Sequence, residues 1–209
     1  MPFSHLLLLR YILLNVVAIA LLVAAYFQGW VGLVVRSDAT RVTIGIAALF
    51  VIGLIACSLS IWRVSREIDR ANSLDPAKTS PVTVYIRLAR GKDAGGRANL
   101  AAAFRHRLFS RIVHIRHIAN TLVVIGLIGT VIGFIIALSG VDPDIATNPN
   151  AVSGMVARLI EGMSVALYTT LVGAILSVWL LACFQILATG TTTLFSLVVE
   201  LGEGVEAGD

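Results

Sequence analysis

The chain has 209 residues, of which 57% are apolar and 13% are charged, and its mean hydropathy is +0.91. Soluble globular domains are about 45–50% apolar and about 25% charged. The composition therefore excludes an ordinary soluble domain and a disordered chain, and it argues against an aqueous enzyme or a free nucleic-acid-binding protein. The net charge of +4 is typical of a membrane protein whose basic loops set its orientation.

Four uncharged runs are long enough to cross a bilayer as helices, because a span needs roughly 20 apolar residues. They cover residues 11–35, 42–62, 118–141 and 162–199. The first run is longer than the core of a signal peptide, which has about 7–15 residues, so we interpret it as a retained span. The last run is too long for one span, and we place its exit near Ala188. The sequence thus predicts an all-α polytopic membrane protein with four transmembrane helices.

Basic side chains gather between the second and third runs. Residues 63–117 hold 12 of the 16 Lys and Arg residues and 4 of the 12 Asp and Glu residues, a net charge of +8. The connection at 139–161 holds three acids and one arginine, a net charge of −2. The positive-inside rule places 63–117 in the cytoplasm. With four spans, both termini are then expected to be cytoplasmic.

The basic segment is predicted to be mostly helical. Residues 61–70 continue the second span, 72–81 and 92–96 are breaks with turn-forming residues, and 97–117 form a helix that runs into the third span. This last helix carries an apolar stripe at helical spacing, which favours packing against a neighbouring helix. The stripe consists of Leu100, Ala103, Phe104, Leu108, Ile112 and Ile115. We expect such helical extensions to lie in the cytoplasm.

The basic helix does not predict a metal or nucleic-acid site. Its histidines, His106, His114 and His117, lack Cys or acidic partners at ligand spacing. No nucleic-acid-binding motif accompanies the charge. The cluster at 105–117 either contacts anionic lipid headgroups or serves only as the orientation signal. We predict no metal, no cofactor and no catalytic residues, and we expect the protein not to be an enzyme.

Spans three and four each carry a stripe of small residues along one helical face. In lipid, small residues let helix backbones approach closely, and hydroxyl groups can form hydrogen bonds across the interface. Generic helix packing also explains such stripes, and a threonine hydroxyl can instead bond a carbonyl of its own helix. The residues alone leave both interpretations open. The stripes are Gly126, Gly129, Thr130, Gly133 and Ala137, and Gly162, Ala166, Thr170, Gly173 and Ser177.

The same stripes resemble the MotA/TolQ/ExbB proton-channel family. Residues 127–133, Leu-Ile-Gly-Thr-Val-Ile-Gly, are similar to the Gly-Thr-Val-x-Gly signature of that family. Residues 162–173 resemble its next span, Gly-x-x-x-Ala-Leu-x-x-Thr-x-x-Gly. The strong likeness covers about 118–188. The four-span plan is similar to MotA, whereas the motifs are closer to the TolQ/ExbB branch.

The chain departs from the family pattern at two places. Many TolQ/ExbB members have a glutamate where this chain has Val165. Glu161 lies one turn earlier and either substitutes for that glutamate or is an interfacial acid, and we favour the second interpretation. A later Ile-Pro pair is replaced by Val178 and Trp179, which puts a proline-dependent kink in doubt.

The resemblance implies a homopentameric ring in the bacterial inner membrane, the stator of a molecular motor. A MotB/TolR/ExbD-like single-span partner would supply a titrating aspartate, because this chain has no ionisable residue deep within a span. Thr130, Thr170 and Thr169 would line the ion pathway. Small residues would pack its face: Gly126, Gly129, Gly133, Ala166, Gly173 and Ser177. The chain would divide into two spans (1–62), a basic cytoplasmic segment (63–117), a channel core (118–188) and a cytoplasmic tail (189–209).

Several alternatives stay open at this point. The conducted ion is a proton by resemblance, although neighbouring hydroxyl groups leave sodium possible. A membrane scaffold would use the stripes only for assembly. A small-solute transporter is less favoured, since spans one and two do not repeat spans three and four and no proline interrupts a span. The sequence does not tell whether flagellar, outer-membrane, gliding or defence work is powered.

Overall fold

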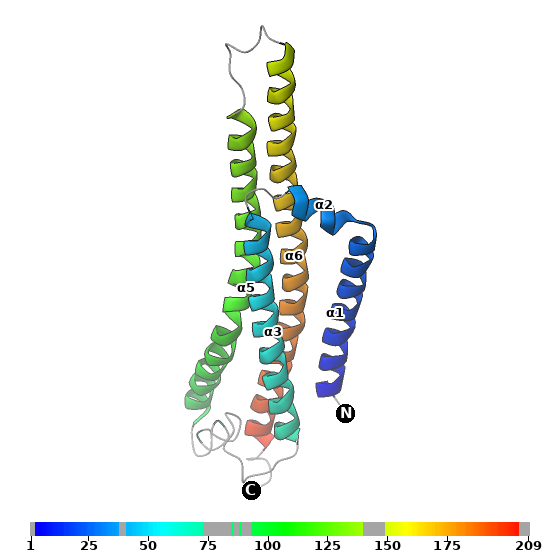
Figure 1. The fold of residues 1–209 in the computed structure, drawn as a ribbon. Helices are drawn as coiled ribbons and strands as arrows, with labels where there is room; N and C mark the ends of the chain where they lie inside the picture. Colours follow the sequence, from blue (N-terminus) through cyan, green and yellow to red (C-terminus); the bar gives the residue numbers. More distant parts are fainter. Residues whose placement is uncertain are drawn as a thin grey trace. The chain divides into compact units, whose positions relative to one another are not determined.

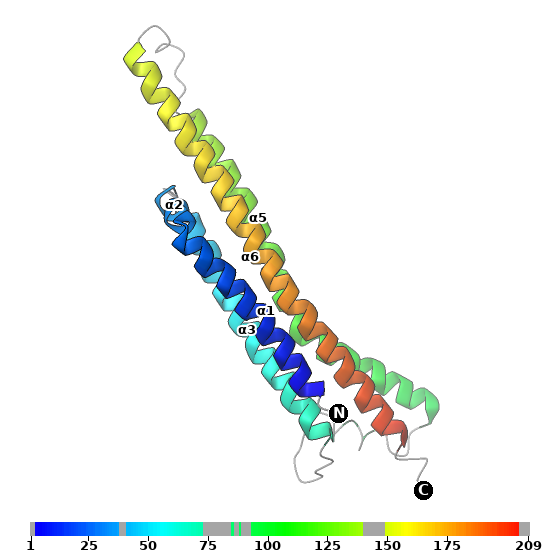
Figure 2. The same cartoon turned by 90° about the vertical axis from the view of Figure 1, so that its right-hand side faces the viewer.

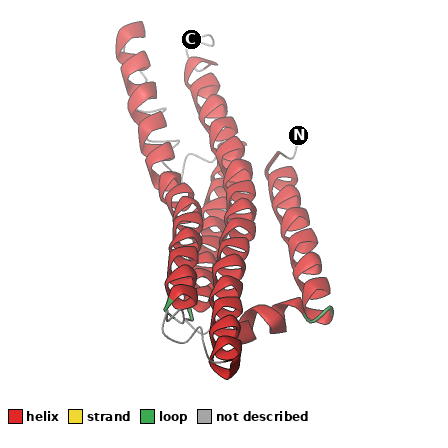
Figure 3. Cartoon of the chain, turned by 90° about the horizontal axis from the view of Figure 1, so that it is seen from above, coloured by secondary structure: helices red, strands yellow, loops and turns green. Residues whose placement is uncertain are grey.

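A computed structural model describes residues 3–37, 41–72, 85, 88, 93–139 and 149–204. Among these residues, helix is the only regular secondary structure (Figure 3). Four of the helices are long and apolar enough to cross a membrane, as predicted. The helices are α1 (Phe3–Phe27), α2 (Trp30–Ser37), α3 (Val42–Asn72), α5 (Ala94–Leu138) and α6 (Pro149–Gly204) (Figure 1).

The first apolar run is divided into two helices, which the sequence did not predict. Helix α1 ends at Phe27, and α2 begins at Trp30. Between them Gly29 has φ of 79°, and its N–H donates to the carbonyl of Tyr26 over 3.0 Å. Glycine adopts this left-handed backbone without steric cost and commonly ends helices. The first span therefore ends near residue 27, not near residue 35.

Helices α3 and α5 extend well beyond their spans. The continuation of the second span through 61–70 is confirmed by α3, and the helix at 97–117 is confirmed as part of α5. Helix α5 starts inside the predicted break at 92–96, because Asp93 caps it: its Oδ1 accepts the Gly96 N–H over 3.1 Å. The predicted loop at 72–81 lies outside the described residues, apart from Asn72, which ends α3.

Helix α6 continues without a break from Pro149 to Gly204, a length of 56 residues. At about 1.5 Å per residue, this is about 84 Å, well above the about 30 Å of the hydrocarbon layer. The expected helical continuation beyond Ala188 is therefore confirmed. The helix also extends before the uncharged run, since Arg158 and Glu161 lie within it.

The chain forms two compact units, and the four long helices each contribute to both. Unit 1 comprises residues 1–15, 54–116 and 182–209, and unit 2 comprises 16–53 and 117–181. In unit 2, α5 and α6 lie side by side (Figures 1 and 2). There, α3 packs against the pair, as the Phe50 and Trp179 ring centroids are 4.9 Å apart.

Unit 1 contains the apolar stripe of the basic helix. Leu108, Ile112 and Ile115 are buried, which confirms that this part of the stripe packs against neighbours. Phe104 is half-buried, and its ring centroid lies 5.2 Å from that of Tyr85. Ala103 is exposed, so the stripe is buried mainly toward its membrane end. The division into domains at 62, 117 and 188 stays a prediction.

Candidate functional site

The small-residue stripes of α5 and α6 face each other in unit 2 and form one seam, which we call the glycine seam. A Cβ atom built on Gly126 would lie 3.3 Å from the Cα of Thr170 and 3.4 Å from the Cα of Gly173. One built on Gly173 would lie 2.8 Å from the Leu122 carbonyl oxygen. The two backbones are therefore in direct contact, as small residues permit in membrane helices.

The seam is tighter nearer the end of α5. A Cβ atom on Gly133 would lie 2.6 Å from the Gly162 carbonyl oxygen and 2.7 Å from the Cβ of Ala166. A Cβ atom on Gly162 would meet the backbone of Ala137. Because backbone cannot rotate away as a side chain can, these positions exclude larger residues. The predicted packing stripe is thus brought together between two helices of the same chain.

Two hydroxyl groups bind across the glycine seam. Thr170 donates from Oγ1 to the carbonyl of Gly126 over 3.0 Å, and Ser177 donates from Oγ to the carbonyl of Ala119 over 2.7 Å. The two donors are seven residues apart on α6, and the two acceptors are seven residues apart on α5. A separation of seven residues is about two helical turns, so one register holds along this part of the seam.

The other two threonines bond to their own helices. Thr169 is 0% exposed and donates to the carbonyl of Val165 over 2.8 Å, and its side chain occupies the space beside Gly129. Thr130 is half-buried and donates to the carbonyl of Leu127. The structure therefore distinguishes threonines that the sequence treated alike. Whether any of them lines an ion pathway stays a prediction.

The seam has a covered side and an open side within unit 2. On the covered side, a Cβ atom on Gly53 of α3 would lie 2.9 Å from Cγ2 of Ile118. Successive residues of a helix are rotated by about 100° about its axis. On α5, Thr130 is therefore rotated about 40° from Gly126, whereas Ile118 is rotated from Gly126 in the other direction. Thr170 lies likewise about 40° from Ala166, toward the side of Thr130. Large apolar side chains surround this open side and are exposed: Val123, Leu127, Val131, Phe134, Met163 and Leu167.

No charged residue belongs to the glycine seam. Val165, where many TolQ/ExbB proteins have glutamate, is 1% exposed, so a carboxylate there would be removed from water. Glu161 is exposed, in keeping with an interfacial acid.

Among the described residues, no group of three or more His, Cys, Asp or Glu side chains is placed to hold a metal ion.

Long apolar helices of this kind define a multi-pass membrane protein. Residues 97–198, which are 102 of the 209 residues, match the model of the MotA/TolQ/ExbB proton channel family. This region contains the whole glycine seam. No curated protein and no solved structure matches the chain. The chain is therefore similar to ion-channel subunits of energy-transducing complexes, and its placement in the TolQ/ExbB branch stays a prediction.

Proposed function

We propose that this chain is the ion-conducting subunit of a motor complex in the bacterial inner membrane. A homopentamer would surround the helices of a single-span partner and couple ion-motive force, by default that of protons, to mechanical work. The observation that carries the proposal is the match over 97–198, a region that contains the glycine seam. The basic segment at 63–117 would be cytoplasmic by the positive-inside rule, with both termini on that side.

A partner is required by the chemistry of the spans. Ion pathways through membranes generally use an ionisable residue, but the four uncharged runs contain no Asp, Glu, Lys or Arg. The partner would therefore bring a carboxylate, as the family resemblance implies. Its protonation would remove a charge and allow the partner helices to move relative to the ring.

The open side of the seam is where the partner carboxylate would lie. On this side, Thr130 and Thr170 are half-buried and are surrounded by exposed apolar side chains. They would hold water or the carboxylate by hydrogen bonds. Thr169 has no exposed surface in the single chain, so it would reach the pathway only where the seam opens. The glycines would keep the two lining helices in fixed register.

The proposal is tested by the mass and composition of the complex purified from its native membrane. We expect a ring of five copies that carries a single-span protein with an aspartate in its span. A monomer or dimer without such a partner would contradict the proposal. It would instead favour a scaffold or a transporter, with the glycine seam serving only helix packing.

The threonines provide a second test. We expect Thr130→Ala to lower ion flux through the assembled complex about tenfold, equivalent to about 1.4 kcal/mol in the barrier. Flux is measured with a pH- or sodium-sensitive dye in vesicles, which also identifies the ion. Thr121→Ala is the matched control, because Thr121 also lies on α5 and bonds its own helix, at the His117 carbonyl. Equal flux in both variants would refute the lining role, provided that both assemble.

A further inference from the structure

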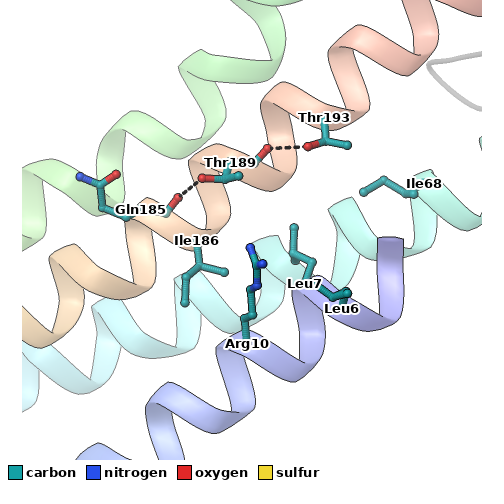
Figure 4. Close-up of a pocket in the computed structure, with 8 residues that line it drawn as sticks. All are labelled: Leu6, Leu7, Arg10, Ile68, Gln185, Ile186, Thr189 and Thr193. Atoms are coloured by element: carbon teal, nitrogen blue, oxygen red, sulfur yellow. Dashed lines mark hydrogen bonds between the residues drawn. The ribbon is translucent and has the colours of Figure 1, made fainter. Parts of the chain in front are cut away.

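An arginine-lined groove in unit 1 has no part in the proposed ion pathway. It has a volume of about 200 Å³, which is room for several water molecules at about 30 Å³ each. Helices α1, α3 and α6 contribute its walls (Figure 4). The lining residues are Leu6, Leu7, Arg10, Ile68, Gln185, Ile186, Thr189 and Thr193.

Among the described residues, the positive charge of the groove has no acidic partner. Arg10 is exposed and extends from α1 toward α6 (Figure 4). It forms no ion pair with the residues that the structure describes, and none of the described residues that line the groove is acidic. An arginine within an apolar helix is costly and normally pairs with an anion or reaches the headgroup region. An anionic group bound in the groove would compensate this charge.

Polar side chains of α6 line the groove together with Arg10. Gln185, Thr189 and Thr193 succeed one another at intervals of four residues, so they lie on one face of the helix. Thr189 donates to the Gln185 carbonyl over 3.0 Å, and Thr193 donates to the Thr189 carbonyl over 3.1 Å (Figure 4). A hydroxyl proton can rotate from such a carbonyl to a stronger acceptor. In Figure 4 the Gln185 amide is drawn pointing away from Arg10. The guanidinium group and the two threonine hydroxyl groups are therefore the donors that the groove offers to a phosphate group.

The apolar part of the lining indicates a lipid as the source of the phosphate. Leu6, Ile68 and Ile186 present hydrocarbon surface beside the polar groups. The side chain of Leu7 also lines the groove and occupies the space over Gly190. A free phosphate ion would gain nothing from this surface, whereas a lipid would place its glycerol and acyl chains there.

We infer that this groove binds the phosphate headgroup of an anionic phospholipid, with Arg10 as its principal contact. The bound lipid would fix the start of α1 against α6. In the orientation proposed above, the lipid belongs to the cytoplasmic leaflet. The site itself does not depend on whether the chain conducts ions.

The test compares lipid retention by the full complex and its variants. Complexes from nanodiscs with equal amounts of phosphatidylglycerol and phosphatidylcholine are released into detergent, and bound lipids are counted by native mass spectrometry. We expect the unmodified complex to retain phosphatidylglycerol selectively, and Arg10→Gln to retain about tenfold less. Thr193→Val should reduce retention about threefold. The mass of the ring, measured in the same spectrum, shows whether each variant assembles.

Arg63→Gln is the matched control, because Arg63 is an exposed cation of unit 1 that does not line the groove. An equal loss in Arg10→Gln and Arg63→Gln would indicate diffuse attraction to basic side chains and overturn the site. Unchanged retention in Arg10→Gln would overturn it as well. Displacement of the lipid by inorganic phosphate at equal concentration would identify free phosphate, not lipid, as the ligand.

Discussion

The glycine seam and the contacts of α1 show two different ways of holding membrane helices together. In the seam, the backbones of α5 and α6 touch, and hydroxyl groups reinforce the contact. Helix α1 instead uses long polar side chains. Tyr11 and Ser58 are joined by a hydrogen bond of 2.6 Å, and Asn15 donates to the Sγ atom of Cys183 over 3.7 Å. The most apolar stretch of α1 is 6% buried, whereas that of α6 is 33% buried.

The difference teaches where this chain tolerates change. A backbone contact fixes distance and register at once, and any added side chain must push the helices apart. A side-chain contact leaves the distance between the helices and their rotation adjustable. If one hydrogen bond is lost, the side chain can adopt another rotamer and form a different one. We therefore expect the seam to be intolerant of substitution and the α1 contacts to be tolerant. Lipid or neighbouring protein would cover the exposed surface of α1.

The largest expected effect comes from widening the seam. Gly162→Val adds a branched side chain whose Cβ atom would already meet the backbone of Ala137 and Gly133, so we expect the free energy of unfolding to fall by about 3 kcal/mol. Gly154→Val is the control on the same helix, since nothing lies within 4 Å of a Cβ atom there. Denaturant titration in micelles, followed by circular dichroism, measures both. Similar stability of the two variants would show that the seam is not tight.

A smaller effect is expected from removing one hydrogen bond across the seam. Ser177 is 1% exposed, and Ser177→Ala removes its bond to the Ala119 carbonyl, which should lower the free energy of unfolding by about 1 kcal/mol. The same titration of Ser164→Ala serves as the control, because the Ser164 hydroxyl donates to the Ile160 carbonyl of its own helix. If Ser164→Ala is as destabilising, the bond across the seam has no special value.

The smallest effect is expected at α1. Tyr11→Phe removes the hydroxyl that bonds Ser58, but Ser58 still donates to the Leu54 carbonyl over 2.9 Å. We expect a decrease of about 0.5 kcal/mol in the free energy of unfolding, measured by the same titration. Tyr26→Phe, at a side chain that is 64% exposed, should change nothing. A loss as large as that of Gly162→Val would mean that α1 is held as tightly as the seam.

Hydropathy and helical periodicity predicted much of the fold. They located the four spans, the extension of α3 through 61–70, and the continuity of 97–117 with the third span. These features depend on local sequence, because a helix in lipid must satisfy its own backbone hydrogen bonds. The division of the first run at Gly29 was not predicted. A single glycine in an apolar run either continues a helix or ends it, and the outcome depends on how the next residues pack in three dimensions.

The stripes of the seam were predicted, but the partners of the individual hydroxyl groups were not. Thr130 and Thr170 each lie at the edge of a glycine face, yet only Thr170 reaches a carbonyl of the other helix. That choice depends on the axial register of two antiparallel helices, which the sequence of either helix does not contain. The role of Gly53, which admits Leu180 and Ile118 against α3, was missed for the same reason.

The seam is electrically neutral along its whole length, which has a consequence for membrane voltage. Moving one elementary charge across the bilayer changes the energy by about 2.3 kcal/mol per 100 mV, but a helix without side-chain charges gains or loses almost nothing. The uncharged runs 118–141 and 162–199 would therefore feel little direct force from the field. The glycine seam itself would therefore contribute little to any voltage dependence of a complex that contains this chain.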